Sequence, residues 1–73
     1  HQAAELWTAV LDEGGALEYP LAADRHAWLQ LATGTVEING VTLGAGDGAA
    51  VTAEPVLRIT AQSQAELLLF DLA

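Results

Sequence analysis

Few side chains in this sequence could carry out acid–base or metal chemistry, and the best candidates lie around His26. Asp24 stands two residues before it, and Glu18 or Glu37 would have to complete a ligand set. Imidazole together with carboxylates is a donor set that binds divalent transition metals. Such a site also needs hydrogen bonds that orient its ligands. We therefore consider Asp24 and His26 as candidate metal ligands, against the alternative of an exposed or hydrogen-bonded imidazole near the start of a strand.

The other patterns that can support catalysis are missing or are better explained by turns. The chain has no cysteine nucleophile, and Ser63 lies in a polar stretch with no nucleophile motif around it. The glycine-rich segment 44–48 has no lysine and no helix after it, so we expect a turn there and no phosphate site. His1 is terminal, and we expect it to be mobile. The sequence predicts no catalytic and no cofactor-binding residue in this chain.

Composition limits the partners that this chain can have. It has 73 residues, is 52% hydrophobic and lacks cysteine, so its small core has no disulfide support and we expect one face to pack on another domain or a second copy. Two arginines, no lysine and a net charge of −8 argue against binding to nucleic acid and to anionic membrane surfaces. No apolar run approaches the ~20 residues of a membrane helix. With no signal-peptide pattern and no cysteine, we expect a cytoplasmic location.

The elements that position these residues are expected to be strands. Apolar residues alternate with polar ones in short runs, and turn residues separate the runs, which is typical of an all-β sandwich or small barrel with about eight short antiparallel strands. The expected turns include Gly34, Asn39-Gly40 and Gly46-Asp47, of which Asn-Gly is a strong hairpin signal. The expected strands are Glu5–Leu11, Ala16–Leu21, His26–Ala32, Thr35–Ile38, Val41–Leu43, Ala49–Thr52, Val56–Ala61 and Ala65–Leu72.

The middle of the chain resembles a known family. The segment RHAWLQLATGTVEINGVTLGAGDGAAV, together with the terminal AELLLFDL, is similar to the C-terminal cupin domain of the pirin family, in its bacterial quercetinase-type branch. The resemblance implies a cupin-like barrel or sandwich, the double-stranded β-helix. It also implies that residues 1–73 are one degenerate domain, a fragment of a longer two-cupin protein. In that family the N-terminal domain holds iron or another divalent metal, and several members are described as having quercetin 2,3-dioxygenase activity.

The resemblance also indicates where metal ligands would stand. The spacing of the first cupin motif, counted back from Gly34, places its glutamate on Ala27. Its two histidines fall on Ala22 or Ala23 and on Pro20 or Leu21, and the histidine of the second motif falls on Leu57. None of these side chains binds a metal, so we expect no metal and no cofactor in this chain.

Three functions remain open from the sequence. The first is a metal-free structural domain that packs on an N-terminal cupin domain or associates with itself. The second is a barrel whose interior binds a flavonoid-like small molecule. In the third, the chain belongs to a metal-dependent dioxygenase with its active site in the N-terminal domain. Trp7, Trp28 and Tyr19 are candidate interface or ligand contacts, although for Trp28 the core is a further alternative.

Overall fold

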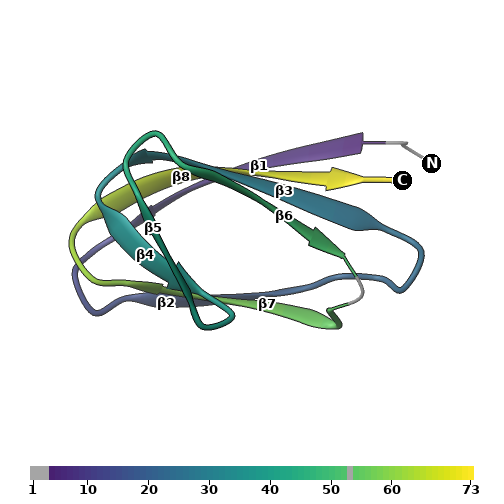
Figure 1. Cartoon of the computed structure of the whole chain (residues 1–73), viewed down its shortest axis with the longest axis horizontal. Coiled ribbons are helices and arrows are strands. Elements are labelled where there is room, and N and C mark those ends of the chain that lie inside the picture. Colours follow the sequence, from purple (N-terminus) through teal and green to yellow (C-terminus); the bar gives the residue numbers. More distant parts are fainter. Residues whose placement is uncertain (1–3, 53) are drawn as a thin grey trace.

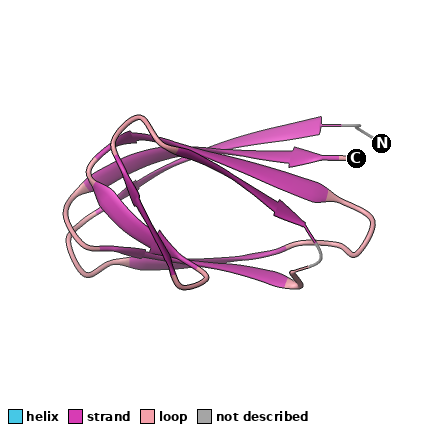
Figure 2. Cartoon of the chain, viewed as in Figure 1, coloured by secondary structure: helices cyan, strands magenta, loops and turns pink. Residues whose placement is uncertain are grey.

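The chain folds into a sandwich of two four-stranded antiparallel sheets (Figures 1 and 2). The computed structural model describes residues 4–52 and 54–73, and the expectation for His1 lies outside them. The first sheet has the strand order β1-β8-β3-β6 and the second has the order β2-β7-β4-β5. The strands are β1 (Ala4–Leu11), β2 (Ala16–Pro20), β3 (His26–Thr33), β4 (Thr35–Ile38), β5 (Val41–Gly44), β6 (Gly48–Thr52), β7 (Val56–Ala61) and β8 (Ala65–Leu72).

The all-β prediction is confirmed, and each expected strand lies within one residue of its observed bounds. The alternation of side chains explains why, since each strand sends every second residue into the space between the sheets. In β3, Leu29 and Leu31 are buried, whereas His26 is exposed on the outer side. Pro20 ends β2, an edge strand, where its missing N–H costs no ladder hydrogen bond. No helix able to cross a membrane occurs in the described ranges.

The core lies between the two sheets and is almost wholly apolar. Both layers contribute side chains to it, and Figure 1 shows the layers facing each other along the length of the molecule. The largest side chains that are fully buried are Leu29, Leu31, Ile38, Leu57, Ile59, Leu67, Leu69 and Val36. This packing fills the interior positions of β3, β4, β7 and β8.

The hairpin turn between β4 and β5 is built by Asn39 and Gly40. Their φ angles are +46° and +88°, as a type I′ turn requires of both central residues. The Asn39 side chain also accepts a hydrogen bond from the Arg58 backbone N–H at 2.7 Å and donates to the Val56 carbonyl at 3.1 Å. It thereby attaches the hairpin tip to β7.

The turn between β5 and β6 is closed by the Asp47 side chain. Its Oδ2 accepts a hydrogen bond from the Gly44 backbone N–H at 2.9 Å, while the Asp47 N–H donates to the Gly44 carbonyl at 2.9 Å. Gly46 takes φ +90° between them. These contacts give the glycine-rich segment a turn-forming role.

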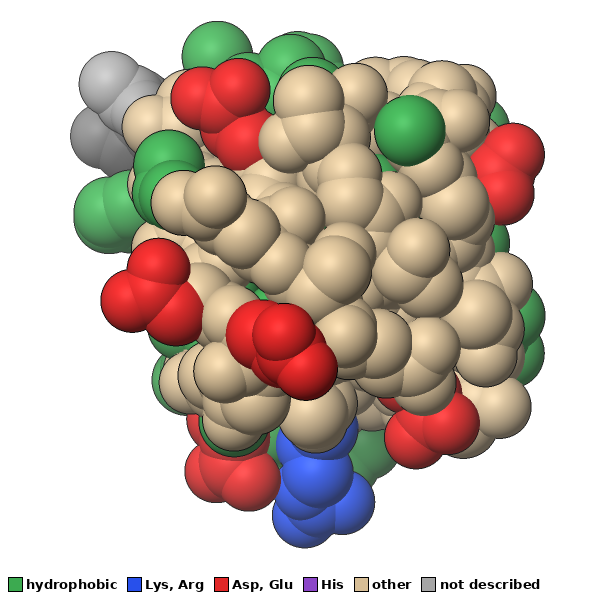
Figure 3. All heavy atoms as spheres, turned by 90° about the vertical axis from the view of Figure 1, so that its left-hand side faces the viewer, with side chains coloured by type: hydrophobic (Ala, Val, Ile, Leu, Met, Phe, Trp, Pro, Cys, Tyr) green, Lys and Arg blue, Asp and Glu red, His purple; other side chains and the backbone are tan. Residues whose placement is uncertain are grey.

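The end of the sandwich that carries the β1–β2 and β7–β8 turns has no concentrated charge. Figure 3 looks onto this end and shows acidic side chains spread over it, with basic side-chain atoms at its lower edge. Much of the remaining surface is backbone and uncharged side chains. The acidic side chains of this end therefore lie at its surface.

Candidate functional site

The positions where the cupin pattern would place metal ligands carry no donor atoms. Ala27, Leu57 and Leu21 are all buried in the core. Ala22 and Ala23 are exposed in the loop between β2 and β3. Methyl and isobutyl groups cannot coordinate a metal ion, which needs imidazole, thiolate or carboxylate ligands. The residues present at these positions do not fit a metal ion.

The alternative ligand set around His26 is not brought together either. His26 and Asp24 are exposed at the start of β3 and in the loop before it, in the first sheet. Glu18 and Glu37 are exposed on the outer side of the second sheet, in β2 and β4. Within the described ranges, no three or more metal-ligating side chains form a group. Glu18 instead pairs with Arg58 at 3.3 Å.

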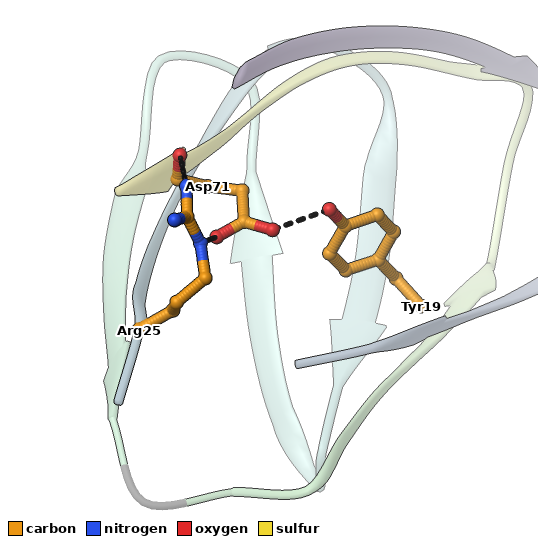
Figure 4. Close-up of polar contacts among 3 residues, drawn as sticks. All are labelled: Tyr19, Arg25 and Asp71. Carbon is orange, nitrogen blue, oxygen red and sulfur yellow. Dashed lines mark hydrogen bonds and ion pairs between the residues drawn. The ribbon is translucent and has the colours of Figure 1, made fainter. Parts of the chain in front are cut away.

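A polar cluster of Tyr19, Arg25 and Asp71, in which Asp71 is buried and the other two are partly buried, lies next to the ligand positions. Figure 4 shows Asp71 on β8 with Tyr19 reaching it from β2 and Arg25 from the following loop. The Tyr19 hydroxyl donates to Asp71 Oδ2 at 2.5 Å, and Arg25 Nε donates to Oδ1 at 2.5 Å. Arg25 Nη2 also donates to the Asp71 backbone carbonyl at 2.9 Å. The cluster links the two sheets and fixes the loop between β2 and β3.

The register places this cluster beside the positions of the cupin ligands. Asp71 is the direct cross-strand partner of Ala27, and Tyr19 is the partner of Leu57. Side chains opposite one another on antiparallel strands lie on the same face of the sheet. The interior polar groups at this end of the sandwich are therefore paired with each other, and the carboxylate is satisfied by a guanidinium and a phenol.

The electrostatics of the cluster keep Asp71 ionised. Burial of the Asp71 carboxyl tends to raise its pKa, but hydrogen bonds from Tyr19 and Arg25 and the guanidinium charge outweigh burial, so the pKa lies below its ordinary value of 3.8. Burial and the hydrogen bond to Asp71 raise the pKa of the Tyr19 phenol. The hydrogen bond to Asp71 raises the pKa of the Arg25 guanidinium, although burial opposes it. This is a structural ion pair, with no group tuned to exchange a proton near neutral pH.

The lowered pKa of Asp71 predicts a loss of stability in acid. A carboxyl with a depressed folded-state pKa contributes its stabilisation fully above the ordinary value of 3.8, and this stabilisation is lost as the pH falls through the folded-state pKa. Urea unfolding followed between about pH 7 and pH 2 should show this decline, and Asp71→Asn should flatten it. Glu18→Gln, at the exposed pair with Arg58, is the control and should keep the decline. An equally steep acid decline in Asp71→Asn would contradict the assignment.

The sequence alone does not reveal this cluster. It places Asp71 in the final strand without a role, and it offers Tyr19 only as an interface or ligand contact. One signal is present in the sequence. Asp71, Leu67 and Leu69 are alternate residues of the same strand and therefore point to the same side, so a strand that buries the two leucines must also bury the Asp71 carboxylate. The partners of Asp71 lie 46 and 52 residues away in sequence, so no local pattern identifies them.

Trp28 is not part of the core, so the core alternative for this residue is wrong. Its indole is 39% exposed on the outer side of the first sheet. The ring lies over Gly48 on the edge strand β6, where an added Cβ would come within 2.3 Å of it. Its Nε1–H donates to Gln30 Oε1 at 3.3 Å. Trp28 therefore forms part of the outer surface of the first sheet.

That surface is an apolar face that crosses the first sheet. In the strand register, Leu6 lies opposite Phe70, Phe70 opposite Trp28 and Trp28 opposite Ala50. This row therefore runs across all four strands. The apolar face, as we use the term, comprises Leu6, Val10, Trp28, Leu68, Phe70 and Leu72, and four of them are exposed large hydrophobics. Exposed apolar surface of this kind makes the face a candidate interaction site.

Comparisons with known proteins agree on one family. A family model described as the quercetinase C-terminal cupin domain matches residues 1–72. A pirin-like protein from Caulobacter vibrioides is 48% identical over 65 residues, which cover 89% of this chain and 28% of that protein. A quercetin 2,3-dioxygenase from Escherichia coli is 42% identical over 74 residues, which cover 99% of this chain and 31% of that protein.

A solved structure gives the same result. The bacterial pirin YhhW from Escherichia coli, determined in complex with nickel(II), superposes with a TM-score of 0.94 at 40% identity, covering 99% of this chain and 31% of that one. The chain thus spans only about three-tenths of the length of these relatives. The similarity concerns one part of a longer protein.

Proposed function

Because the chain belongs to the quercetinase C-terminal cupin domain family of pirin-like proteins, we propose that it is the non-catalytic half of a two-cupin protein and packs on an N-terminal cupin domain. The observation that carries the proposal is the apolar face of the first sheet. Its central row, Leu6–Phe70–Trp28, leaves large apolar side chains in contact with solvent. Covering such a face with a second domain removes that apolar area from water and stabilises both domains.

The contrast between the two outer faces supports the choice of surface. The outer side of the second sheet presents Glu18, Glu37 and Arg58, together with threonines, and suits solvent. The outer side of the first sheet carries a single carboxylate among the described strand residues. This is Glu66, near the start of β8, which pairs with Val10 of β1. Charged residues are depleted at the centre of stable interfaces. The first sheet therefore fits a protein partner and the second does not.

We further propose that the longer protein is a metal-dependent enzyme of the quercetin 2,3-dioxygenase type. Support comes from the name of the E. coli relative and from the nickel(II) complex of YhhW. In this chain Ala27 and Leu57 offer no ligand atom, so the proposal places iron, nickel or another divalent metal in the N-terminal domain. A cytoplasmic location stays a prediction from the cysteine-free sequence.

Leu6→Glu tests the packing proposal. The side chain is 58% exposed, so in the 73-residue chain the substitution should change the free energy of unfolding by no more than about 0.5 kcal/mol. In the longer protein it would bury an unpaired carboxylate between two domains, which costs several kcal/mol. After proteolytic cleavage between the domains, the two halves of the wild type should co-elute on size exclusion, and those of Leu6→Glu should associate at least tenfold more weakly.

Val41→Glu is the matched control for this experiment. Val41 is 57% exposed on β5, the edge strand of the other sheet, so a glutamate likewise replaces an aliphatic side chain at nearly equal exposure, away from the apolar face. The halves should co-elute in this variant. Equal association of the halves in Leu6→Glu and wild type would contradict the packing proposal. If Leu6→Glu instead abolished self-association of intact copies, the apolar face would be a dimer interface.

A further inference from the structure

The first and second sheets leave a hollow where their edges meet at β1 and β2. This seam hollow has a volume of ≈ 300 Å³. It is bordered by residues 7–9 of β1, which are Trp7, Thr8 and Ala9, and by Leu17 and Tyr19 of β2, and the buried side chains of Leu67 and Leu69 form its floor. It lies outside the packed core and opens at the edge of the sandwich, so a ligand can enter it without rearranging the core.

The register of β1 shows which of its side chains face the hollow. Trp7, Ala9 and Leu11 share one side of this strand, the side that turns toward the second sheet, because Trp7 pairs with Leu69 and Ala9 with Leu67. Ala9 brings only a methyl group to the hollow that it lines together with Trp7. The indole of Trp7 is 51% exposed although it lies on the inner side of its strand.

The lining determines which chemistry suits the hollow. The Trp7 and Tyr19 rings lie 6.3 Å apart and are tilted by 57°, so two aromatic faces from different strands border the same space. The Tyr19 hydroxyl already donates to Asp71, which fixes the ring and leaves its apolar body toward the hollow. With a net charge of −8 the chain also repels anions. An apolar wall with two aromatic rings favours a flat, neutral molecule that stacks or packs edge-on.

We propose that the seam hollow is a binding site for a small neutral aromatic molecule of one or two rings. Its volume lies at the lower end of the range for ligand pockets. The seam hollow replaces the barrel interior as the place where a ligand would bind, since the interior positions of β3, β4, β7 and β8 are filled by their own side chains.

The seam hollow is independent of the apolar face. Trp7 and Ala9 lie on one side of β1, whereas Leu6 and Val10 lie on the other, so the two proposals rest on different side chains of this strand. Leu6→Glu should therefore leave ligand binding unchanged. Failure of one proposal does not entail failure of the other.

Indole is the probe, and the side-chain N–H signal of Trp7 is the readout. The chain has two tryptophans, so Trp28→Phe leaves Trp7 as the single indole of the protein and assigns its resonance in a ¹H–¹⁵N spectrum. Titration of the ¹⁵N-labelled chain with unlabelled indole should shift the Trp7 signal saturably, with sub-millimolar to millimolar affinity as expected for so small a ligand. The Trp28 signal of the wild type should stay in place.

Ala9→Ile fills the hollow with a side chain that suits a strand and should weaken indole binding at least tenfold while the fold is kept. Ala16→Ile is the matched control, because Ala16 is exposed on β2 and faces outward next to Leu17. It should bind like the wild type. If Ala9→Ile perturbs the fold, Trp7→Leu provides a second test, read from the backbone signals of Leu17 and Tyr19.

Three results would overturn the proposal. One is the absence of a saturable shift at Trp7, and another is equal binding by Ala9→Ile and the wild type. The third is binding by this chain alone that disappears in the longer protein, because the hollow would then be covered by protein and would be an interface position. Saturable binding in both proteins, lost in Ala9→Ile and kept in Ala16→Ile, supports the site.

Discussion

Replacing Asp71 with alanine is expected to destabilise the domain by about 2–4 kcal/mol, since it leaves the Arg25 guanidinium without its carboxylate inside the sandwich. The Asp71 side chain is only 8% exposed and that of Arg25 is 15% exposed, so water replaces the lost contacts poorly. The Tyr19 hydroxyl loses its acceptor as well. A domain of this size has a total stability of about 4–11 kcal/mol, so Asp71→Ala should be partly unfolded at modest urea concentrations.

The exposed pair of Glu18 and Arg58 is the matched control for this prediction. Their side chains are 67% and 71% exposed, and the pair joins two strands of one sheet. Glu18→Ala should therefore change stability by about 0–1 kcal/mol in the same urea titration. The double variant Asp71→Ala/Arg25→Met should be less destabilised than Asp71→Ala, because the guanidinium that has lost the Asp71 contacts is removed as well. An Asp71→Ala effect as small as that of Glu18→Ala would show that the buried cluster does not hold the sheets together.

The sequence was sufficient for the fold where the decisive signals are local. The Asn39-Gly40 pair defines a hairpin through its own backbone preferences, and the Leu29/Leu31 alternation defines which side of β3 is buried. Such signals act over a few residues, and they agree with each other along most of the chain. The strand bounds could therefore be predicted nearly to the residue.

The candidate sites were harder, because they depend on contacts between distant residues. β1 is apolar on both sides, with Leu6 and Val10 on one and Trp7 on the other, so its periodicity does not show which side faces the core. Only the register of β1 with β8 shows which side chains of β1 belong to the apolar face and which border the seam hollow. The burial of Asp71 likewise becomes meaningful only once Arg25 and Tyr19 are placed beside it.

Gly34→Ala is the substitution with the other large expected effect, a loss of about 3 kcal/mol or more. Gly34 has φ +85°, a conformation that costs an L-residue about 1–2 kcal/mol by itself. An added Cβ would also lie 2.2 Å from the Gln64 carbonyl oxygen and 2.8 Å from the Ala65 Cα. Both neighbours are backbone atoms at the start of β8, so the clash cannot be relieved by rotating a side chain.

Gly40→Ala separates the steric part of this effect from the backbone part. Gly40 has nearly the same angle, φ +88°, but a Cβ there would meet no atom within 4 Å. The Gly40→Ala variant should therefore lose only the stability that a positive φ angle costs an L-residue, about 1–2 kcal/mol. Thermal and urea unfolding of the two variants should differ by the cost of pushing β8 away from the β3–β4 turn. Equal losses would mean that β8 moves aside freely, which is incompatible with a strand that pairs on both sides with β1 and β3.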